Sequence, residues 1–303
     1  MQDLKGQLAF ITGGASGAGL GQAKVFGRAG ARIVIADIRQ DAVDTALSQL
    51  HAEGIRAHGI ILDITDRAAY AKAADEVDDV FGGPPTILSN TAGVNSFGPI
   101  ENTTYDDFDW IIGVNLGGTI NGCVTFIPRM IASGKPGHVV SVSSMGGLQG
   151  ASMAAPYSAA KAAVINLMES YRQGLAKYQI GVSVVCPANI KSNIAEASKL
   201  RPAQFAHSGY VENEQSIASL HSIHAFGMEP EQLAEAILRG IRSNAAYIIP
   251  YPEVREELEA HFREIVDSVA PMDSDPEGAR QRVEALNNWR AGRSKVFNSE
   301  GAG

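Results

Sequence analysis

Short apolar runs alternate with longer helical patterns along most of the chain. The runs are rich in Val and Ile and show little alternation with polar residues, which is typical of strands buried on both faces. They predict seven strands, at residues 8–11, 32–37, 56–62, 86–89, 138–143, 181–186 and 246–249. The stretches between them predict helices, among them 20–29, 42–53, 67–81 and 157–178. This order implies right-handed crossovers and an α/β fold, a doubly wound parallel seven-stranded sheet with helices on both faces.

Two regions break this rhythm. Residues 189–228 separate the sixth strand from a helix expected near Glu231, which is too long for an ordinary connection, so a substrate lid is expected there. The aromatic and histidine residues of this segment are Phe205, His207, Tyr210, His221, His224 and Phe226. Near the C-terminus, PYPEVREELEAHFREIV predicts an amphipathic helix, the segment after Pro271 turns charged, and NSEGAG is expected to be flexible. The sequence thus predicts one catalytic domain over 1–250 and a C-terminal helical extension over 251–303.

Composition and charge exclude several classes of protein. The 303 residues are 45% hydrophobic, and 25 basic against 33 acidic residues give a net charge of −8 without any basic run. Nucleic acids and anionic membranes are therefore not expected as partners. No apolar run approaches the roughly 20 residues of a membrane span, and the first residues lack a signal-peptide pattern. Cys123 and Cys186 lie in apolar surroundings and predict buried thiols, so a cytoplasmic location is expected.

A glycine-rich turn follows the first predicted strand. Residues 12–19 read TGGASGAG, and Gly13, Gly17 and Gly19 would let the backbone approach a pyrophosphate at a helix N-terminus. The expression G-x-G-x-x-G fails because Gln22 stands at its third glycine. With a strand before it and a helix after it, the turn favours a dinucleotide site on a Rossmann-like sheet. A purely structural tight turn is the alternative.

Polar residues at the ends of the next strands suggest how the nucleotide is held. Asp37 ends the second strand, 18 residues beyond Gly19, and can bond both ribose hydroxyls while repelling a 2′-phosphate, which favours NAD over NADP. Arg39 could instead attract that phosphate, and Asp37 could be a helix cap. Asp63 fits equally well as a partner of the adenine amino group or as a helix cap. In the segment Asn90-Thr91-Ala92-Gly93, small residues allow close passage by the ribose, and Asn90 can tie neighbouring strands together.

The candidate chemistry centres on Tyr157 and Lys161, which share one helix face because they are four residues apart. The lysine cation is expected to lower the tyrosine pKa from about 10, so that the phenol can exchange a proton near neutral pH. A surface cation–aromatic pair is the alternative. Ser143 and Ser144 end the fifth strand, and one of them should face the site and bond the substrate oxygen. Asn115 lies inside a helical pattern that it disfavours, where its amide could kink the helix and hold a water next to Lys161.

Taken together, these residues resemble the short-chain dehydrogenase/reductase family over roughly residues 5 to 250. TGGASGAG and NTAG match two of its motifs, and its Asn–Ser–Tyr–Lys tetrad falls on Asn115, Ser144, Tyr157 and Lys161, which selects Ser144 over Ser143. The resemblance implies hydride transfer between nicotinamide C4 and a carbinol carbon. In it, Tyr157 is the base, Ser144 the oxyanion partner, Lys161 the pKa setter and ribose holder, and Asn115 the residue that positions a relay water. It also implies a homodimer or homotetramer.

The resemblance extends to the contacts of the cofactor. After the sixth strand the family pattern P-G-x-[VI]-x-T reads PANIKS here, so Ser192 keeps a hydroxyl for the carboxamide, whereas Ala188 and Asn189 depart from the pattern. The NAD contacts expected on this basis are Gly13, Ser16, Gly17, Ala18, Gly19, Asp37, Ile38, Asp63, Ile64, Asn90, Ala92, Gly93, Tyr157, Lys161, Ile190 and Ser192. No metal is expected, because His221 and His224 have no acidic or Cys ligand at the right spacing.

The segments SNTAGVNSFGPIENTTYDDFDWIIGVNLGG, PANIKSNIAEASKLRP, GYVENEQSIASLHSIH and IIPYPEVREELEAHF are similar to bacterial Cα-dehydrogenases of lignin β-aryl ether breakdown. That likeness implies NAD-dependent oxidation of the benzylic alcohol of arylglycerol-β-aryl ethers to the ketone. The substrate contacts expected are Asn95, Phe97, Ser144, Gln149, Asn189 and Tyr210, with Tyr210 and Phe205 able to stack on aryl rings. Two alternatives stay open, namely an oxidoreductase for a steroid or polyol and a non-catalytic protein that senses the dinucleotide.

Overall fold

The computed structural model describes residues 1–210, 225–271 and 274–298. The chain forms two compact units, Met1–Pro252 and Glu253–Gly303. The first unit holds the sheet and every candidate site residue, and the second holds the C-terminal helices.

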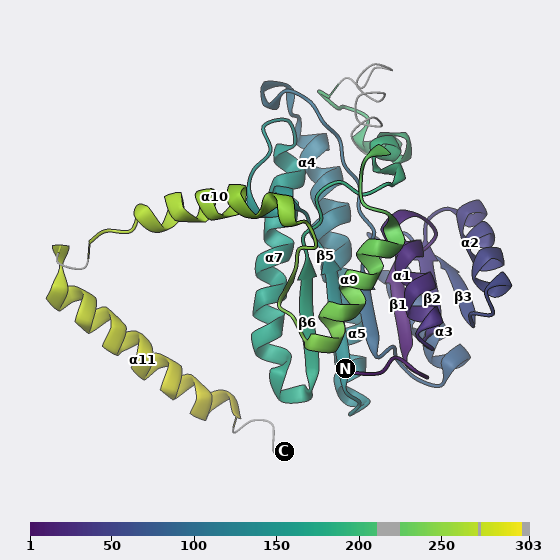
Figure 1. Ribbon diagram of the computed structural model, residues 1–303, viewed down its shortest axis with the longest axis horizontal. Helices are drawn as coiled ribbons and strands as arrows, with labels where there is room; N and C mark the ends of the chain where they lie inside the picture. Colours follow the sequence, from purple (N-terminus) through teal and green to yellow (C-terminus); the bar gives the residue numbers. More distant parts are fainter. Residues whose placement is uncertain (211–224, 272–273, 299–303) are drawn as a thin grey trace. The chain divides into compact units, whose positions relative to one another are not determined.

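A single parallel sheet of seven strands forms the first unit, in the order β3-β2-β1-β4-β5-β6-β7 (Figure 1). The strands are β1 (Leu8–Thr12), β2 (Arg32–Asp37), β3 (Ala57–Ile61), β4 (Ile87–Asn90), β5 (Gly137–Val142), β6 (Ile180–Val185) and β7 (Tyr247–Ile248). All seven predicted strands and the doubly wound fold are confirmed, with strand ends that differ by at most one residue. β1 is buried at every position because both faces of the sheet are covered.

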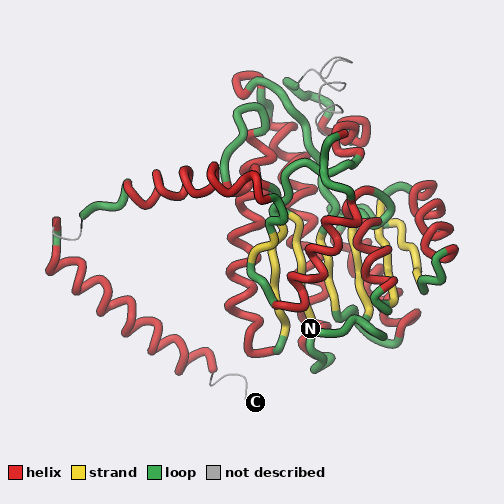
Figure 2. Tube along the Cα trace, viewed as in Figure 1, coloured by secondary structure: helices red, strands yellow, loops and turns green. Residues whose placement is uncertain are grey.

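Helices cover both faces of the sheet, and Figure 2 shows the strands between them. They are α1 (Gly17–Arg28), α2 (Gln40–Ala52), α3 (Arg67–Phe81), α4 (Tyr105–Ile112), α5 (Gly118–Ala132), α6 (Met145–Leu148), α7 (Ala155–Leu175) and α9 (Pro230–Ser243). One apolar core lies beneath α1, α2 and α9, and a second lies beneath α3, α5 and α7. Adjacent strand residues therefore serve different cores. Phe10 packs on Tyr70 and Phe126 in the second core, and Ile11 belongs to the first.

One long helix is interrupted by a wider turn. The π-helical turn η2 (Gly113–Gly117) joins α4 to α5, and together they form a helix over Tyr105–Ala132. By length and composition alone this helix could cross a membrane, which corrects the expectation that no segment is long and apolar enough. Of its most apolar 18-residue window, 56% is buried inside the first unit. Packing on the sheet accounts for this apolar character.

The two ends of the predicted lid segment, residues 189–228, pair with each other. Ile190 and Met228 form a parallel bridge, in which the Lys191 amide donates to Met228 O (3.1 Å) and the Met228 amide donates to Asn189 O (2.9 Å). The described residues of the segment include the 3₁₀ helices η4 (Asn193–Leu200) and η5 (Ala203–Phe205). His221 and His224, considered above as metal ligands, lie outside the described residues.

The C-terminal unit contains α10 (Arg255–Asp267) and α11 (Pro276–Asn298). The helix predicted from the PYPEVREELEAHFREIV pattern is confirmed as α10. The helix α11 lies within the helical extension predicted for 251–303, although its bounds were not predicted. Within it, Arg280 pairs with Glu277 at 2.7 Å and with Glu284 at 3.5 Å, and such pairs one turn apart support an exposed helix. The flexible end predicted for NSEGAG falls, from residue 299 onward, outside the described residues.

Candidate active site

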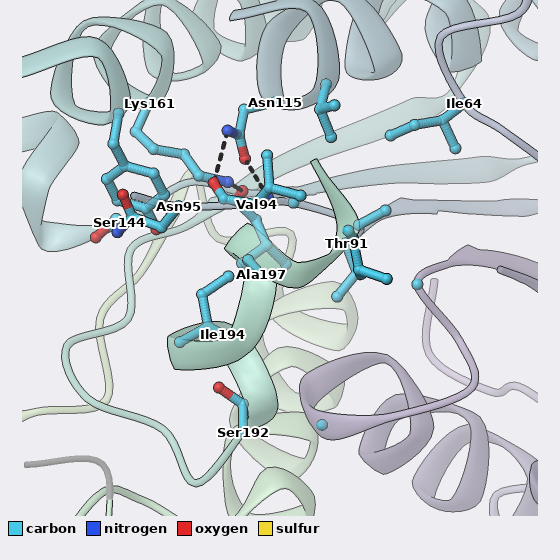
Figure 3. Close-up of a pocket in the computed structure, with 18 of the residues that line it drawn as sticks. Ile64, Thr91, Val94, Asn95, Asn115, Ser144, Lys161, Ser192, Ile194 and Ala197 are labelled. Atoms are coloured by element: carbon cyan, nitrogen blue, oxygen red, sulfur yellow. Dashed lines mark hydrogen bonds between the residues drawn. The ribbon is translucent and has the colours of Figure 1, made fainter. Parts of the chain in front are cut away.

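A cavity of about 920 Å³ lies beyond the carboxyl ends of the strands, where ligands bind in open parallel sheets. The turns after six of the strands line it, together with parts of α4, η2, α7 and residues 194–205. Figure 3 shows ten labelled lining residues, with Asn115, Ser144 and Lys161 among them. All four residues of the predicted tetrad line this cavity, as does every residue expected to contact the cofactor except Asn90.

The glycine-rich turn forms a cradle in which a side chain would not fit. Gly13 has φ +63°, and a Cβ added there would lie 2.9 Å from the Cα of Ala92. A Cβ on Gly19 would lie 2.1 Å from the carbonyl oxygen of Gly13. The turn precedes α1 directly and lines the cavity, so its backbone amides lie where a pyrophosphate can approach. The residues present therefore fit a bound dinucleotide.

Asp37 is buried at the end of β2 and is clamped by Arg39. Its Oδ1 accepts a hydrogen bond from Arg39 Nε (3.0 Å), and its Oδ2 accepts one from Arg39 Nη2 (3.1 Å). The same Nη2 donates to Ser16 Oγ in the glycine turn (2.9 Å). Helix α2 has Arg39 as its N-cap residue, so the alternative that Asp37 caps this helix is wrong. The positive charge of Arg39 is thus already paired with the carboxylate beside it.

The neighbouring acidic and amide residues take distinct positions. Asp63 Oδ1 accepts hydrogen bonds from the amide (2.9 Å) and the hydroxyl (2.7 Å) of Thr65, and Asp66 is the residue that caps α3. The cap alternative for Asp63 is therefore wrong, and its side chain lies at the cavity. Asn90 is buried beneath the cavity and donates to Ser141 Oγ (3.1 Å) on the paired strand β5, as expected for a tie between strands.

Tyr157 and Lys161 lie on the same face of α7 and reach the cavity from it. Lys161 Nζ is 5.5 Å from the centre of the Tyr157 ring and donates to Val142 O (2.9 Å). Lys161 is only 3% exposed, which excludes the alternative of a surface cation–aromatic pair. Ser143 donates to the carbonyl of Lys161 (2.7 Å) and so attaches α7 to β5. Ser144 accepts from the Gly146 amide (3.1 Å) and hydrogen-bonds to Tyr157, so the two serines take different roles.

Asn115 lies in the middle of the π-helical turn, where the kink predicted from its sequence position is found. Its Nδ2 donates to the carbonyls of Ile111 (2.9 Å) and Val94 (2.9 Å), and its Oδ1 accepts from the Val94 amide (3.2 Å). Figure 3 shows these contacts to Val94 as dashed lines. A Cβ on Gly93 would lie 2.6 Å from Asn115 Oδ1 and 3.4 Å from Lys161 Nζ. The close approach of the Asn115 amide to the backbone here therefore requires glycine at position 93.

The pKa of Tyr157 differs from the sequence expectation. Burial raises it, and the hydrogen bond with Ser144 offsets only part of that rise. Lys161 does not lower it as expected: its Nζ lies over the ring at 5.5 Å from the centre, and burial and the Ser144 hydrogen bond are the causes of the shift. Burial lowers the pKa of Lys161 to about 8. In the protein alone, both groups thus disfavour their charged forms, and deprotonation of the phenol requires a further positive charge nearby.

A Lys161→Met variant is expected to be more stable than the wild type by about 2 kcal/mol at pH 7. The folded-state pKa of about 8 lies below the ordinary 10.5, so the folded protein binds its proton more weakly than the unfolded chain. Wild-type stability should therefore rise as the pH increases from about 8 to 10.5, and the advantage of the variant should shrink over that window. Thermal unfolding at pH 7 and pH 10 measures this, with the exposed Lys72→Met as control. A lower Tm for Lys161→Met at pH 7 would contradict the expectation.

The residues expected to contact the substrate are not all at the cavity. Asn95, Phe97, Ser144 and Asn189 line it, whereas Gln149 and Tyr210 do not. The Tyr210 hydroxyl bonds Thr103 Oγ (2.6 Å), and a Cβ on Gly98 would lie 2.2 Å from the Tyr210 ring. The expectation that Tyr210 stacks on an aryl ring is thus corrected, because its ring is buried under residues 98–103. Gln149 follows α6 and is half-buried outside the cavity lining.

One wall of the cavity was expected only in part from the sequence. It is an apolar surface contributed by α4 and by residues 194–205, and we call it the aryl wall; its members are Trp110, Ile194, Ala197, Leu200, Pro202 and Phe205. The lid segment 189–228 was expected to border the substrate, whereas Trp110 was not. The one available signal was an isolated Trp in DDFDWII, but an aromatic residue in an apolar helix is more often a core residue. Within the described part of the chain, no group of three His, Cys, Asp or Glu residues is placed to hold a metal ion.

Comparisons with known proteins agree with this geometry. The model of the short chain dehydrogenase family matches residues 7–202. The chain is 73% identical over 297 residues to the C alpha-dehydrogenase of Sphingobium sp. (strain NBRC 103272 / SYK-6), covering 98% of this chain and 97% of that protein. It is similar to the apo form of LigD from Sphingobium sp. strain SYK-6 (TM-score 0.76, 63% identity), with 89% of this chain and 100% of that one covered.

A further likeness is to a short chain dehydrogenase/reductase from Burkholderia phymatum in complex with NAD. The two have a TM-score of 0.82 and 26% sequence identity, with 89% of this chain and 98% of that chain covered. The family model covers more than half of the sequence, and the sheet order, the glycine turn and the tetrad positions are consistent with it. This chain belongs to the short-chain dehydrogenase/reductase family.

Proposed function

We propose that this protein is an NAD-dependent dehydrogenase that oxidises the benzylic Cα alcohol of arylglycerol-β-aryl ethers to the ketone. The observation that carries the proposal is one cavity in which Ser144, Tyr157 and Lys161 face an apolar wall and adjoin a glycine cradle. The relative named C alpha-dehydrogenase supports this substrate, because 73% identity extends over nearly both whole chains and includes the segments outside the tetrad. A dehydrogenase acting on an alcohol is also what the family implies.

The nucleotide site favours NAD. Gly13, Gly17 and Gly19 would hold the pyrophosphate, and the Asp37 carboxylate would accept hydrogen bonds from the adenosine ribose. A 2′-phosphate would meet the negative charge of Asp37, and Arg39 is engaged by that same carboxylate. The NAD complex of the Burkholderia relative supports this choice. Ser192 lies directly against Gly17 at the cavity, because a Cβ on Gly17 would be 3.2 Å from the Ser192 Cβ.

In the mechanism we propose, NAD supplies the acceptor for a hydride at nicotinamide C4. Tyr157 accepts the proton of the substrate hydroxyl, and Ser144 donates a hydrogen bond to the same oxygen as the carbonyl forms. Lys161 would hold the ribose, and the positive charge of the oxidised nicotinamide would favour the phenolate of Tyr157. Asn115, fixed by Val94 and Ile111, places its Oδ1 beside Gly93, where it would hold a water next to Lys161 that carries the proton toward solvent.

The character of the cavity suits a substrate with two aromatic rings. The volume of about 920 Å³ includes the glycine cradle and the Asp37 end assigned to NAD, so the support comes from the side chains beside Ser144 and Tyr157. The aryl wall offers apolar and aromatic surface, whereas Asn95 and Asn189 offer the polar contacts that a glycerol side chain and methoxy groups require. The apolar wall disfavours a polyol as substrate, and a steroid is the competitor to be tested.

The test of this proposal is the initial rate of NADH formation with a racemic arylglycerol-β-guaiacyl ether, compared with steroid and sugar alcohols at equal concentration. We expect fast turnover of the ether alone, and a plateau near half conversion if one enantiomer is used. Turnover of a steroid or sugar alcohol without turnover of the ether would refute the substrate and leave the dehydrogenase chemistry standing. A repeat with NADP in place of NAD tests the cofactor.

We further propose that the protein is a homodimer or homotetramer in the cytoplasm. Members of this family are usually oligomeric. On the outer face of α5, Val124 is 62% exposed, and Ile120 is also exposed, which is the apolar character that a subunit interface requires. Light scattering coupled to size-exclusion chromatography measures the oligomeric state directly.

A further inference from the structure

Arg201 connects the aryl wall to helix α4 through three contacts. Its Nη2 lies 2.9 Å from Asp107 Oδ1, and its guanidinium carbon lies 4.3 Å from the centre of the Trp110 ring. Its Nη1 donates to the carbonyl of Phe205 at 3.3 Å. The side chain is only 9% exposed, so a planar cation is held between a carboxylate, an indole and a backbone carbonyl. Arg can make all three contacts at once because its donors form a flat, rigid fork.

Asp107 is the anchor of this arrangement. Its side chain is fully buried, and its Oδ2 accepts hydrogen bonds from the Thr104 amide (3.0 Å) and the Gly209 amide (3.2 Å). Its Oδ1 accepts from the Ser208 hydroxyl at 2.6 Å. The carboxylate thus begins α4 and fastens residues 201–209 onto it with one group. Burial alone raises the pKa of Asp107, but these hydrogen bonds outweigh burial and lower it, so the group stays charged.

Trp110 lies one turn beyond Asp107 on α4, and its ring lines the cavity while Arg201 covers it. The indole is 2% exposed and packs with Val94, Ile111 and Ala197 in the apolar cluster against which Tyr157 also packs. A cation above one face of an indole restricts its rotation and adds attraction beyond packing. The position of the Trp110 ring therefore depends on Arg201, as does the position of Leu200, Pro202 and Phe205 around it.

We propose that Arg201 is a positioning residue that sets the acceptance of two-ring substrates by holding the aryl wall against α4. This inference rests on the proposed function, because it concerns the aryl ether. A single-ring benzylic alcohol needs only the part of the cavity beside Ser144 and Tyr157. A two-ring ether needs the aryl wall as well, so loss of the Arg201 contacts weakens its binding selectively and leaves the proton transfer unchanged.

The experiment compares two substrates, an arylglycerol-β-guaiacyl ether and 1-phenylethanol, in wild type, Arg201→Gln and Arg201→Lys. For Arg201→Gln we expect the KM of the ether to rise about tenfold with kcat within about twofold, and both constants of 1-phenylethanol to stay unchanged. Arg201→Lys keeps the charge opposite Asp107 but loses the planar stack over Trp110. Its KM for the ether should therefore lie between those of the wild type and Arg201→Gln. The matched control is Lys199→Ala, which removes the exposed pair with Glu196 two residues away.

The outcomes distinguish a failure of the inference on Arg201 from a failure of the proposed function. An unchanged KM for the ether in Arg201→Gln, or an equal rise for both substrates, overturns the inference. If Arg201→Gln does not fold, Trp110→Leu removes the aromatic surface without breaking the ion pair, and the same selective rise in KM is required of it. A wild-type protein that turns over 1-phenylethanol but ignores the ether refutes the proposed function and this inference with it. Wild-type turnover of the ether with unaffected variants refutes the inference alone.

Discussion

A Tyr157→Phe variant is expected to lose about a thousandfold or more in kcat for oxidation of the aryl ether. The change removes only the hydroxyl that is placed to accept the substrate proton, and the ring that packs in the cluster with Trp110 and Ala197 remains. Binding of NAD should change little, because the glycine cradle and Asp37 are untouched. Steady-state NADH formation measures kcat, and titration calorimetry with NAD measures the binding.

The matched control is Tyr178→Phe, which removes an exposed hydroxyl just beyond the end of α7. A pH profile adds a second check. Burial raises the pKa of Tyr157, so the fraction of phenolate grows as pH increases, and kcat/KM for oxidation in the wild type should rise from neutral toward alkaline pH. A Tyr157→Phe variant with kcat within tenfold of the wild type would remove the tyrosine from the mechanism and assign the base elsewhere.

An Asp37→Ser variant is expected to shift the cofactor preference from NAD toward NADP. Loss of the carboxylate removes the acceptor for the ribose, which should lower kcat/KM with NAD by roughly a hundredfold. It also releases Arg39 from its two hydrogen bonds with Asp37, so the guanidinium is free to meet a 2′-phosphate. We therefore expect kcat/KM with NADP to rise by at least about tenfold, measured as the ratio of initial rates with the two cofactors.

The double variant Asp37→Ser with Arg39→Ala separates these two effects. It should lose the gain with NADP and keep the loss with NAD, because the cation that receives the phosphate is gone. An unchanged kcat/KM with NADP in Asp37→Ser alone would show that Arg39 does not reach the 2′-phosphate. Its hydrogen bond to Ser16 in the glycine turn would then be the contact that holds it away.

Local patterns predicted much of this fold and much of the candidate site. The five inner strands follow from apolar runs because they are buried on both faces, whereas β3 and β7 at the sheet edges are partly exposed. The positions of Tyr157 and Lys161 on one helix face follow from a spacing of four residues, which the geometry of any α-helix enforces. Asn115 in a helical pattern pointed to a kink, and the kink exists as a π-helical turn.

Other features depend on partners far away in the sequence. Tyr210 was expected at the substrate, but its hydroxyl meets Thr103, more than a hundred residues earlier, and buries the ring there. The pKa of Tyr157 was expected to fall because of Lys161, whereas the depth of burial, which spacing does not reveal, raises it. The lid segment was expected at the substrate, but the part that Trp110 takes in the aryl wall was missed for the same reason. Arg201 meets Asp107 and Trp110 there, and no single segment contains that arrangement.

The π-helical turn at Gly113–Gly117 fixes the rotational phase between the two halves of the long helix. A π turn holds one more residue than an α turn, and each residue rotates an α-helix by about 100°. If the same residues wound as a regular α-helix, α4 would be turned through about that angle relative to α5, which is packed on the sheet. Trp110 and Asp107 would then leave the cavity side together. The extra residue thus sets the orientation of α4 relative to α5. Because of it, one continuous helix packs on the apolar core with α5 and lines the reaction cavity with α4.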